Sequence, residues 1–600
     1  MTLLNLFLKK SIFLITFISL AHCHSGSLPA TTTSTETSTP NTFKRPAPRT
    51  IDTSQDVVDT VLQTPHFRFI THNSVLDTTN VKEIAVARES NLKALQALIG
   101  NSQKVVPINY HIYPSIEQKA LRKKTIKIAS LDEGNNSIYV VENRHFQGSQ
   151  QSLESTLLIR QVLSKPIITA LEDGLSKHFT KKWQRRGYDY WGGKLYQSSN
   201  MPPLDELLNE EIYQNESPLV MGAMSGVFVD FLIMHFGQDI FLKNYGTWTA
   251  KDLTSLKSEW ADFLKQRYSN FNAEKENRTV PNTLLKGFNF AHEGYRIYNG
   301  YGSQLAKESL EKLSTINSNA VSIVPYTFMR NPKKPRHLLV KHRDGSENDE
   351  SVLFAHFEAQ ELGMHTMLKP QIWLRGSWPG DIQMSSEEDW AAFFDAYYRW
   401  MRHYSLLAEI NGFDSLCVGV EFVKATLSKE KEWRQLIQQL RGLYSGPMTY
   451  AANWGREFEN VKFWDALDFI GLNCYYPLSI KGNPSKKELK RGFDRVVHKI
   501  EKVTERFGKP LMFTEIGFRS VDSIWRNPHA DAKGRSFNED SQALAYEVVF
   551  EGIRNKNWYR GIFWWKWPSY LDYRGPSNTG FAPTNKKAEE VVKKEFEKVN

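Results

Sequence analysis

The sequence has little of what defines several large classes of protein. Its three cysteines cannot hold together a disulfide-rich scaffold of 600 residues. No stretch beyond the first 25 residues has 18 consecutive apolar residues, which excludes a protein with several membrane-spanning helices. The net charge of +10 is spread along the chain without a long basic run, and we therefore expect no nucleic-acid partner. A hydrophobic fraction of 40% and a charged fraction of 24% exclude a chain that is disordered throughout.

Aromatic residues are plentiful, and their distribution divides the chain. Of the 16 tryptophans, 12 lie between residues 282 and 600, so the two halves differ in composition. A polar segment at 271–282 separates them. We therefore predict one folded domain over residues 50–272 and a second over residues 283–600.

The N-terminus has the features of an export signal. Two lysines precede an eleven-residue apolar run, residues 11–21, which is too short to span a bilayer as a stable helix. We predict a signal peptide over residues 1–23. A Ser/Thr/Pro-rich stretch over residues 24–49 cannot form a core, and we interpret it as a flexible tether.

Cys23 lies between the apolar run and the tether, as in a bacterial lipoprotein acylation site. His22 departs from that pattern, because a small residue is usual before the cysteine. Two outcomes stay open. Either Cys23 is lipidated and tethers the protein to the cell surface or outer membrane, or ordinary cleavage nearby releases a periplasmic or secreted protein.

The first domain combines a few strand-like segments with mostly helical periodicity. Strand-like residues occur at 65–72, 105–114 and 137–146. From residue 151 onward the apolar spacing is helical, so we predict a mostly helical α+β domain. The segment 188–197 is rich in tyrosine and glycine, and it is either a contact loop or internal packing.

The second domain alternates short apolar runs with amphipathic helical segments. The candidate strands are 286–291, 320–326, 364–370, 415–421, 448–453, 467–475, 510–516 and 561–567. Eight buried strands alternating with helices predict an α/β fold, the (β/α)8 or TIM barrel. In that fold the chemistry lies at the carboxyl ends of the strands.

Two glutamates mark such strand ends. Glu421 ends the fourth candidate strand and Glu515 the seventh, so a closed barrel places both on one face. Glycoside hydrolysis needs two carboxyl groups beside the scissile bond, one protonated and the other ionised. Either glutamate alone is better explained as a solvated or salt-bridged residue, but the pair with its aromatic neighbours favours catalysis. This chemistry requires no metal or cofactor.

Other side chains near the strand ends are candidates for sugar binding, because flat rings pack against sugar C–H faces and polar groups pair with hydroxyls. Because residues 564, 565 and 567 alternate in direction, at least one of these three tryptophans serves packing only. The predicted substrate-binding residues are Lys369, Trp373, Arg375, Trp378, Asn453, Trp454, Asn473, Tyr475, Trp565, Trp567 and His292.

The barrel half carries the motifs KGFNFAHEG, MLKPQIWLRGSWPGDI, CVGVEF, MTYAANW, LDFIGLNCYYPL and FTEIGF. With these motifs, residues 284–590 resemble glycoside hydrolase family 113, the β-mannanases of a retaining clan built on this barrel. The resemblance implies that Glu421 is the general acid/base and Glu515 the nucleophile. It also implies a covalent glycosyl-enzyme, with the two carboxyl groups about 5–5.5 Å apart. The wider clan usually has Asn before the acid/base, whereas Val420 stands here.

Two further expectations follow from this assignment. The negative charge of Glu515 should raise the pKa of Glu421, which must carry a proton to act as the acid. We also hypothesise that Tyr475 orients Glu515 through a hydrogen bond.

The helical part of the first domain resembles, less specifically, the gluzincin metallopeptidase fold. Such enzymes hold zinc with an HExxH helix and a downstream glutamate. In the segment LESTL, Glu154 remains, but Leu153 and Leu157 occupy the histidine positions, and Glu172 resembles the downstream ligand. We therefore predict an inactive peptidase-like domain that binds no metal.

Four functions remain open on the sequence. The first is an exported retaining hydrolase of β-1,4-mannan-type chains, and the second applies the same chemistry to glucan, xylan or another β-glycan. The third is a surface glycan-binding protein with an inactive barrel. The fourth, a metallopeptidase, is opposed by the missing histidines. The first three imply a polysaccharide or oligosaccharide partner, and the sequence leaves the oligomeric state open.

Overall fold

The computed structural model describes residues 58–598, apart from 74–77, 101–105, 164, 275, 277, 292, 337, 339, 341–346, 533, 574 and 576. The predicted signal peptide and tether, Cys23 and His292 lie outside the described residues. All described residues belong to one compact unit of the chain.

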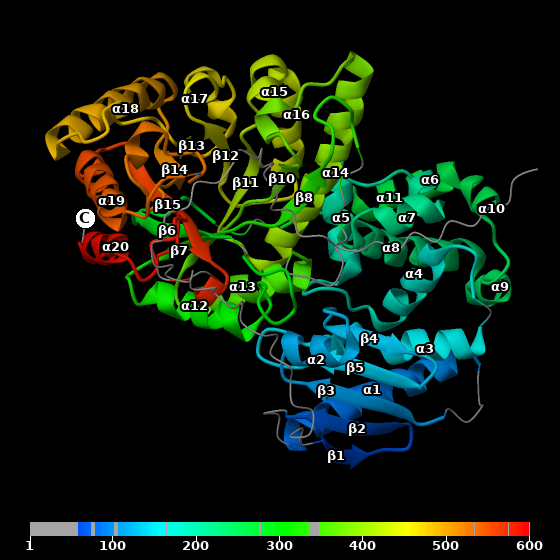
Figure 1. The fold of residues 1–600 in the computed structure, drawn as a ribbon. Coiled ribbons are helices and arrows are strands. Elements are labelled where there is room, and N and C mark those ends of the chain that lie inside the picture. Colours follow the sequence, from blue (N-terminus) through cyan, green and yellow to red (C-terminus); the bar gives the residue numbers. More distant parts are fainter. Residues whose placement is uncertain are drawn as a thin grey trace, which may run out of the picture. The chain divides into compact units, whose positions relative to one another are not determined.

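The described chain begins with a five-stranded mixed sheet in the order β1–β2–β3–β5–β4 (Figure 1). β2, β3 and β5 are parallel, and β1 and β4 pair antiparallel at the two edges. The strands are β1 (Val58–Gln63), β2 (Phe67–His72), β3 (Ile108–Tyr113), β4 (Ala129–Asp132) and β5 (Ser137–Val141). Two helices lie between them in the chain, α1 (Thr78–Leu98) and α2 (Ile116–Lys123).

A helical layer follows the sheet. Its helices are α3 (Leu153–Val162), α4 (Thr169–Thr180), α5 (Gly187–Gln197), α6 (Leu204–Leu208), α7 (Glu210–Asn215), α8 (Pro218–Phe236), α9 (Gln238–Asn244), α10 (Ala250–Thr254) and α11 (Lys257–Tyr268). α8 is long and apolar enough to cross a membrane, but 78% of its most apolar window is buried inside the structure. We therefore interpret α8 as a core helix of this layer. Of the two alternatives for residues 188–197, the structure shows internal packing and no contact loop, because this segment lies in α5 with Tyr188, Trp191 and Leu195 in the core.

The second half forms a closed barrel of eight parallel strands, which confirms the predicted fold class. The strands follow the order β11–β12–β13–β14–β15–β6–β7–β9, with β9 pairing back to β11. They are β6 (Leu285–Ala291), β7 (Ala320–Ile323), β9 (His365–Leu368), β11 (Ser415–Val420), β12 (Met448–Asn453), β13 (Ile470–Cys474), β14 (Leu511–Ile516) and β15 (Tyr559–Pro568). Each of them overlaps one of the strands expected from the sequence.

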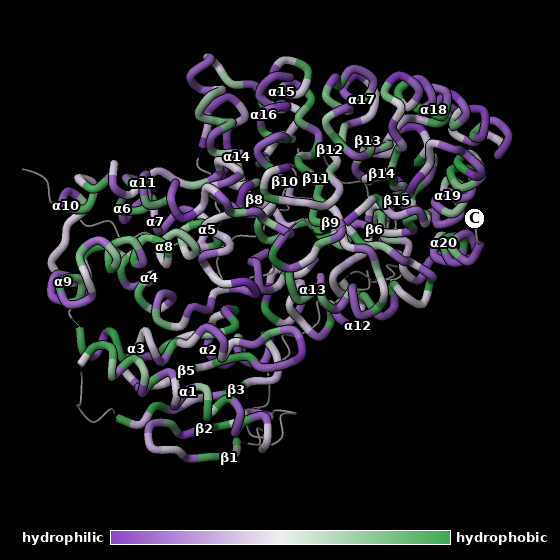
Figure 2. The backbone as a smooth tube through the Cα atoms, turned by 180° about the vertical axis from the view of Figure 1, so that it is seen from behind, coloured by the Kyte–Doolittle hydropathy of each residue, from purple (hydrophilic) through white to green (hydrophobic). Residues whose placement is uncertain are grey.

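Helices surround this barrel, and their turns alternate between hydrophobic and hydrophilic residues (Figures 1 and 2). They are α12 (Gln304–Ser314), α13 (Asp349–Glu361), α14 (Glu387–Asn411), α15 (Val423–Ser428), α16 (Glu430–Arg441), α17 (Arg456–Asn460), α18 (Lys486–Phe507), α19 (Glu539–Ile553) and α20 (Lys587–Glu597). The alternation lets each helix bury one face and leave the other in water.

Two short strands extend the barrel past β7 and β9. β8 (Tyr326–Met329) and β10 (Gln371–Leu374) pair in parallel, with Phe328 opposite Trp373. Each begins three residues after the last residue of the barrel strand that it follows. This small sheet therefore prolongs the carboxyl-end side of the barrel, where a (β/α)8 fold carries its chemistry.

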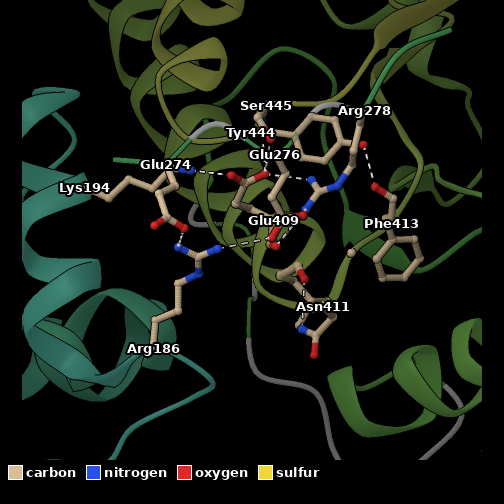
Figure 3. A network of polar contacts seen from close by, with 12 residues as sticks. Arg186, Lys194, Glu274, Glu276, Arg278, Glu409, Asn411, Phe413, Tyr444 and Ser445 are labelled. Atoms are coloured by element: carbon tan, nitrogen blue, oxygen red, sulfur yellow. Dashed lines mark hydrogen bonds and ion pairs between the residues drawn. The ribbon is translucent and has the colours of Figure 1, made fainter. Parts of the chain in front are cut away.

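A buried carboxylate ties the helical layer to the barrel (Figure 3). Glu409 of α14 is 4% exposed and pairs with Lys194 of α5. Arg278, in the connection that precedes the barrel, donates to Glu409 Oε2 at 2.7 Å. The backbone N–H and the hydroxyl of Ser445 donate to the same oxygen at 3.1 and 2.9 Å. We call these four residues the Glu409 node.

Candidate active site

The two predicted catalytic glutamates lie at carboxyl ends of barrel strands. Glu421 follows β11 directly, and Glu515 is the penultimate residue of β14. Asn473 of β13 links them, because it stands opposite Glu515 in the strand register and its side-chain amide donates to Glu421 Oε1 at 3.0 Å. The barrel therefore brings both carboxyl groups to one mouth, as the strand spacing predicts.

Three side chains donate hydrogen bonds to the Glu515 carboxylate. The Lys369 ammonium contacts Glu515 Oε1 at 2.6 Å, and the Gln371 amide donates to the same oxygen at 3.1 Å. Tyr475 donates its hydroxyl to Oε2 at 3.0 Å, which confirms the hydrogen bond expected from the sequence. Because all three groups donate, they fix the orientation of the Glu515 carboxylate.

Lys369 is itself fully buried in the barrel. Besides Glu515, its ammonium contacts Asn289 Oδ1 at 2.9 Å and the Thr514 carbonyl oxygen at 3.2 Å. A buried ammonium is tolerated only when it is paired and hydrogen-bonded, and here both conditions are met. Lys369 is therefore an electrostatic support of Glu515.

Glu421 lies in the opposite kind of environment. Its one described side-chain partner is the amide of Asn473. Burial, and next the negative charge of Glu515, raise the pKa of Glu421 to about 8. The carboxyl is thus protonated at neutral pH, and the effect of Glu515 is the one expected from the sequence. The two carboxyl groups therefore lie in different environments. Glu421 carries a proton, whereas Glu515 is surrounded by hydrogen-bond donors.

Four of the tryptophans predicted to bind sugar are partly or largely exposed, and one of them, Trp565, borders the carboxylate pair. Trp565 is partly exposed, with the Lys369 ammonium 5.6 Å from its ring centroid, so it borders the carboxylate pair. Trp373 is 47% exposed on β10, and Trp378 is 37% exposed on the loop that follows. Trp454 is partly exposed and packs edge-on against Tyr476.

The remaining polar candidates lie at differing depths. Asn473 is buried between the two carboxylates, and Asn453 is partly exposed at the end of β12. Arg375 is exposed, on the loop after β10. Four of the predicted substrate-binding residues therefore lie beside the carboxylate pair: Lys369, Asn473, Tyr475 and Trp565. Three others lie on β10 and the loop that follows it, and they are exposed: Trp373, Arg375 and Trp378.

Trp567 corrects the sequence-based prediction. It is fully buried, and its indole N–H donates to the backbone oxygen and the hydroxyl of Ser309 on α12, both at 3.0 Å. Its ring also packs edge-on against Phe288. Trp567 is thus a core residue between the barrel and its helices, not a substrate contact.

Sequence reasoning missed three residues that belong to this region. Gln371 contacts Glu515, Asn289 contacts Lys369, and Phe328 packs edge-on against Trp373 with 5.8 Å between the ring centroids. Gln371 and Phe328 lie on the short strands β10 and β8. The only sign of these strands in the sequence is that outward-facing and buried positions alternate over four residues, which is too short a pattern to recognise.

In the helical layer, the carboxylates of the peptidase-like pattern have structural partners. Glu154 is fully buried and pairs with Arg88 at 3.1 Å, and Asn91 donates to it at 3.2 Å. Glu172 pairs with Arg160 at 2.6 Å. Across the described residues, no group of three or more His, Cys, Asp or Glu side chains is arranged to hold a metal ion.

Comparison with known proteins places the barrel half in a family context. Similar solved structures include a GH113 β-mannanase from Alicyclobacillus acidocaldarius in complex with ManMIm, 29% identical, covering 52% of this chain and 97% of that chain with a TM-score of 0.48. A GH113 β-1,4-mannanase complex is 28% identical, covering 52% and 99% with a TM-score of 0.47. A β-glucuronidase from Ruminococcus gnavus is 17% identical, covering 52% and 50% with a TM-score of 0.37.

A search of the curated proteins gives no match. The resemblance of residues 50–272 to gluzincins gains no support from these comparisons and stays a prediction. Residues 289–586 match the family model of Glycoside Hydrolase Family 113, and the barrel half is thereby that of a glycoside hydrolase.

Proposed function

We propose that the protein is an exported, retaining glycoside hydrolase that cleaves β-1,4-mannan-type chains. One observation carries the catalytic part of this proposal. Glu515 is surrounded by the donors Lys369, Gln371 and Tyr475, whereas burial and the charge of Glu515 raise the pKa of Glu421 to about 8. An ionised nucleophile beside a protonated acid is what a retaining glycosidase requires.

The first step forms a glycosyl-enzyme. A carboxylate oxygen of Glu515 attacks the anomeric carbon, and a new C–O bond forms as the glycosidic bond breaks. Glu421 gives its proton to the leaving oxygen, so the departing sugar leaves as an alcohol. Tyr475 and Lys369 hold the attacking carboxylate in place, and Asn473 holds the acid.

The second step releases the sugar. Glu421, now ionised, takes a proton from water, and the water oxygen attacks the anomeric carbon. The ester bond to Glu515 breaks, and both carboxyl groups return to their starting protonation states. Two inversions at one carbon give net retention of the anomeric configuration.

The extension sheet supports binding of a chain rather than a single sugar. Gln371 contacts Glu515, and Trp373 lies two residues farther along β10, on the same face and about 7 Å away. Trp373 and its register partner Phe328 are 47% and 49% exposed. In this proposal, the ring pair carries a sugar next to the one that is cleaved.

The choice of mannan and the export rest on other grounds. The mannan assignment follows the resemblance of the barrel motifs to family 113, together with the family match over residues 289–586. Export rests on the signal-like N-terminus, residues 1–23, with Cys23 as a candidate lipidated membrane tether.

The decisive experiment is product release from defined β-1,4-linked oligosaccharides. Manno-, gluco- and xylo-series are incubated with the protein, with Glu515→Ala as the control. We expect cleavage of the manno-series, loss of several powers of ten in rate in the variant, and a first-formed product of retained configuration by NMR.

Each alternative has its own outcome in this experiment. Cleavage of the gluco- or xylo-series alone would replace mannan by another β-glycan. An inverted product would refute the covalent intermediate. No cleavage of any series would refute the hydrolase assignment and leave the glycan-binding protein, which a glycan array then tests.

A further inference from the structure

A second buried carboxylate lies close to Glu421. Glu457 of α17 is fully buried. The hydroxyls of Tyr450 and Thr426 each donate to its Oε1 at 2.7 Å, and the backbone N–H of Asn453 donates to its Oε2 at 2.6 Å. The mechanism gives Glu457 no part, yet a carboxylate in the core needs a reason, because its burial costs free energy.

Tyr450 connects Glu457 to the backbone of the acid. Its hydroxyl accepts a hydrogen bond from the N–H of Phe422 at 2.6 Å, while it donates to Glu457. The ring is closely packed, since a Cβ on Gly419 would lie 2.8 Å from it and the Trp433 ring lies with its centroid 5.2 Å away. The hydroxyl is therefore held in a fixed place.

Glu421 needs such support, because its φ of 58° lies in the left-handed region. A residue with a side chain persists there only when its surroundings determine it. The N–H of Glu421 donates to the carbonyl oxygen of Ala451 at 2.9 Å, and the next N–H, that of Phe422, is held by Tyr450. The peptide groups on both sides of the acid are thus fixed.

We propose that Glu457, acting through the Tyr450 hydroxyl, is a positioning residue for Glu421. It holds the proposed acid/base in the left-handed backbone conformation from which the carboxyl reaches Asn473. This inference rests on the proposed function, because Glu421 needs aiming only if it transfers a proton.

Burial raises the pKa of Glu457 to about 7, so above that pH Glu457 is charged, and this charge acts in the same direction as its geometry. The groups that face Glu421 are Glu515, Asn473, Glu457 and Lys369. After burial and the charge of Glu515, the charge of Glu457 also raises the pKa of Glu421, whereas Asn473 and Lys369 lower it. A neutral residue at position 457 should therefore let the acid lose its proton at a lower pH.

Glu457→Gln is the direct test, because an amide nitrogen that faces the Asn453 N–H opposes a donor, and one that faces the two hydroxyls replaces the oxygen to which both donate. Tyr450→Phe is the second variant, since it breaks the link and keeps the ring. Matched controls are Glu459→Gln on the same helix and Tyr397→Phe. Tyr397 is buried and donates its hydroxyl to the Val418 carbonyl oxygen at 2.9 Å.

The readout compares two substrates through kcat/KM, which reports the first chemical step. An unactivated manno-oligosaccharide needs a proton from Glu421, whereas a 2,4-dinitrophenyl β-mannoside has a leaving group that needs none. We expect both test variants to lose about tenfold or more on the oligosaccharide and less than about threefold on the dinitrophenyl substrate. The alkaline limb of Glu457→Gln should move to lower pH, and both controls should match the wild type.

An activity-independent measurement keeps the two proposals separable. The protein is labelled with 13C-carboxyl glutamate, and the Glu421 signal is assigned by its loss in Glu421→Gln. Its titration midpoint should fall in Glu457→Gln and stay unchanged in Glu459→Gln. If the wild type cleaves none of the glycans, the proposed function fails, while this titration still decides whether Glu457 acts on the Glu421 carboxyl. Equal losses on both substrates, or an unchanged midpoint, would overturn the positioning role.

Discussion

Replacing either of the two carboxyls proposed to be catalytic, Glu421 and Glu515, by its amide should abolish activity, yet the two replacements should change stability in opposite directions. In Glu421→Gln the amide oxygen keeps the bond from Asn473, and the carboxyl group whose ionisation is disfavoured in the folded protein is gone. In Glu515→Gln the buried Lys369 loses its counter-charge, and the new amide group meets donors on every side. The first variant should be more stable than the wild type, and the second less.

The gain in Glu421→Gln depends on pH with a fixed sign. The folded protein keeps the Glu421 proton up to about pH 8, whereas the unfolded chain releases it near 4.5. The free energy of unfolding of the wild type therefore falls as pH rises through this window. Glu421→Gln removes this loss, so its advantage should be absent at pH 4.5 and complete above pH 8.

The size of the effect follows from the same values. A rise in pKa from 4.5 to about 8 corresponds to roughly 5 kcal/mol at most. Because Glu421 is partly exposed, solvent screening reduces this figure, and we expect about 2 kcal/mol. Breaking the Lys369–Glu515 pair should cost about 3–5 kcal/mol. For a folded unit of this size, 1 kcal/mol moves the thermal midpoint by roughly 1 °C.

Scanning calorimetry at pH 4.5 and pH 8.5 measures these differences. Glu421→Gln should unfold about 2 °C above the wild type at pH 8.5 and level with it at pH 4.5, and Glu515→Gln should unfold several degrees below it at pH 8.5. A destabilised Glu421→Gln at pH 8.5, or the same gain at both pH values, would refute the assignment of Glu421 as the protonated partner.

Three further outcomes are expected. Trp373→Ala should raise KM for long manno-oligosaccharides and leave short ones unaffected, and an equal effect on both lengths would exclude an outer sugar contact. Trp567→Phe should lower the thermal midpoint without changing KM, because the indole bonds only core groups, and a raised KM would return this residue to the sugar site. Lys194→Met should lower the free energy of unfolding by about 3 kcal/mol in urea, because Glu409 keeps only Arg278 as a cation, and the double variant with Glu409→Gln should recover part of the loss.

The barrel could be predicted from the sequence because buried parallel strands are continuous apolar runs, and each such run overlaps a barrel strand. That Glu421 and Glu515 meet at one mouth of the barrel could be predicted from topology alone, since both glutamates end strands of a closed barrel. Three short strands carried too little signal. β8, β10 and β4 have four residues each, and their burial is interrupted or partial. β7 and β9 are equally short, but they are buried along all or nearly all of their length and therefore form continuous apolar runs.

Trp567 was misplaced for a physical reason. Side chains two apart on a regular strand share a face, which groups Trp565 with Trp567. In β15 the pairing with β6 shifts register between Trp564 and Trp567, so this periodicity breaks where it was applied. Glu457 gave no signal at all, because a carboxylate on a five-residue helix has the sequence of a surface turn.

The Glu409 node also sets an order of events during synthesis. Lys194 and Arg278 precede Glu409 in the chain, by 215 and 131 residues. At about 5–20 residues per second, roughly 10–40 s pass between the emergence of Lys194 and that of its partner. During that interval the helical layer has been synthesised but the Lys194 ammonium has no Glu409 carboxylate to pair with. A shortened chain that begins at residue 283 would leave Glu409 without either of these cations.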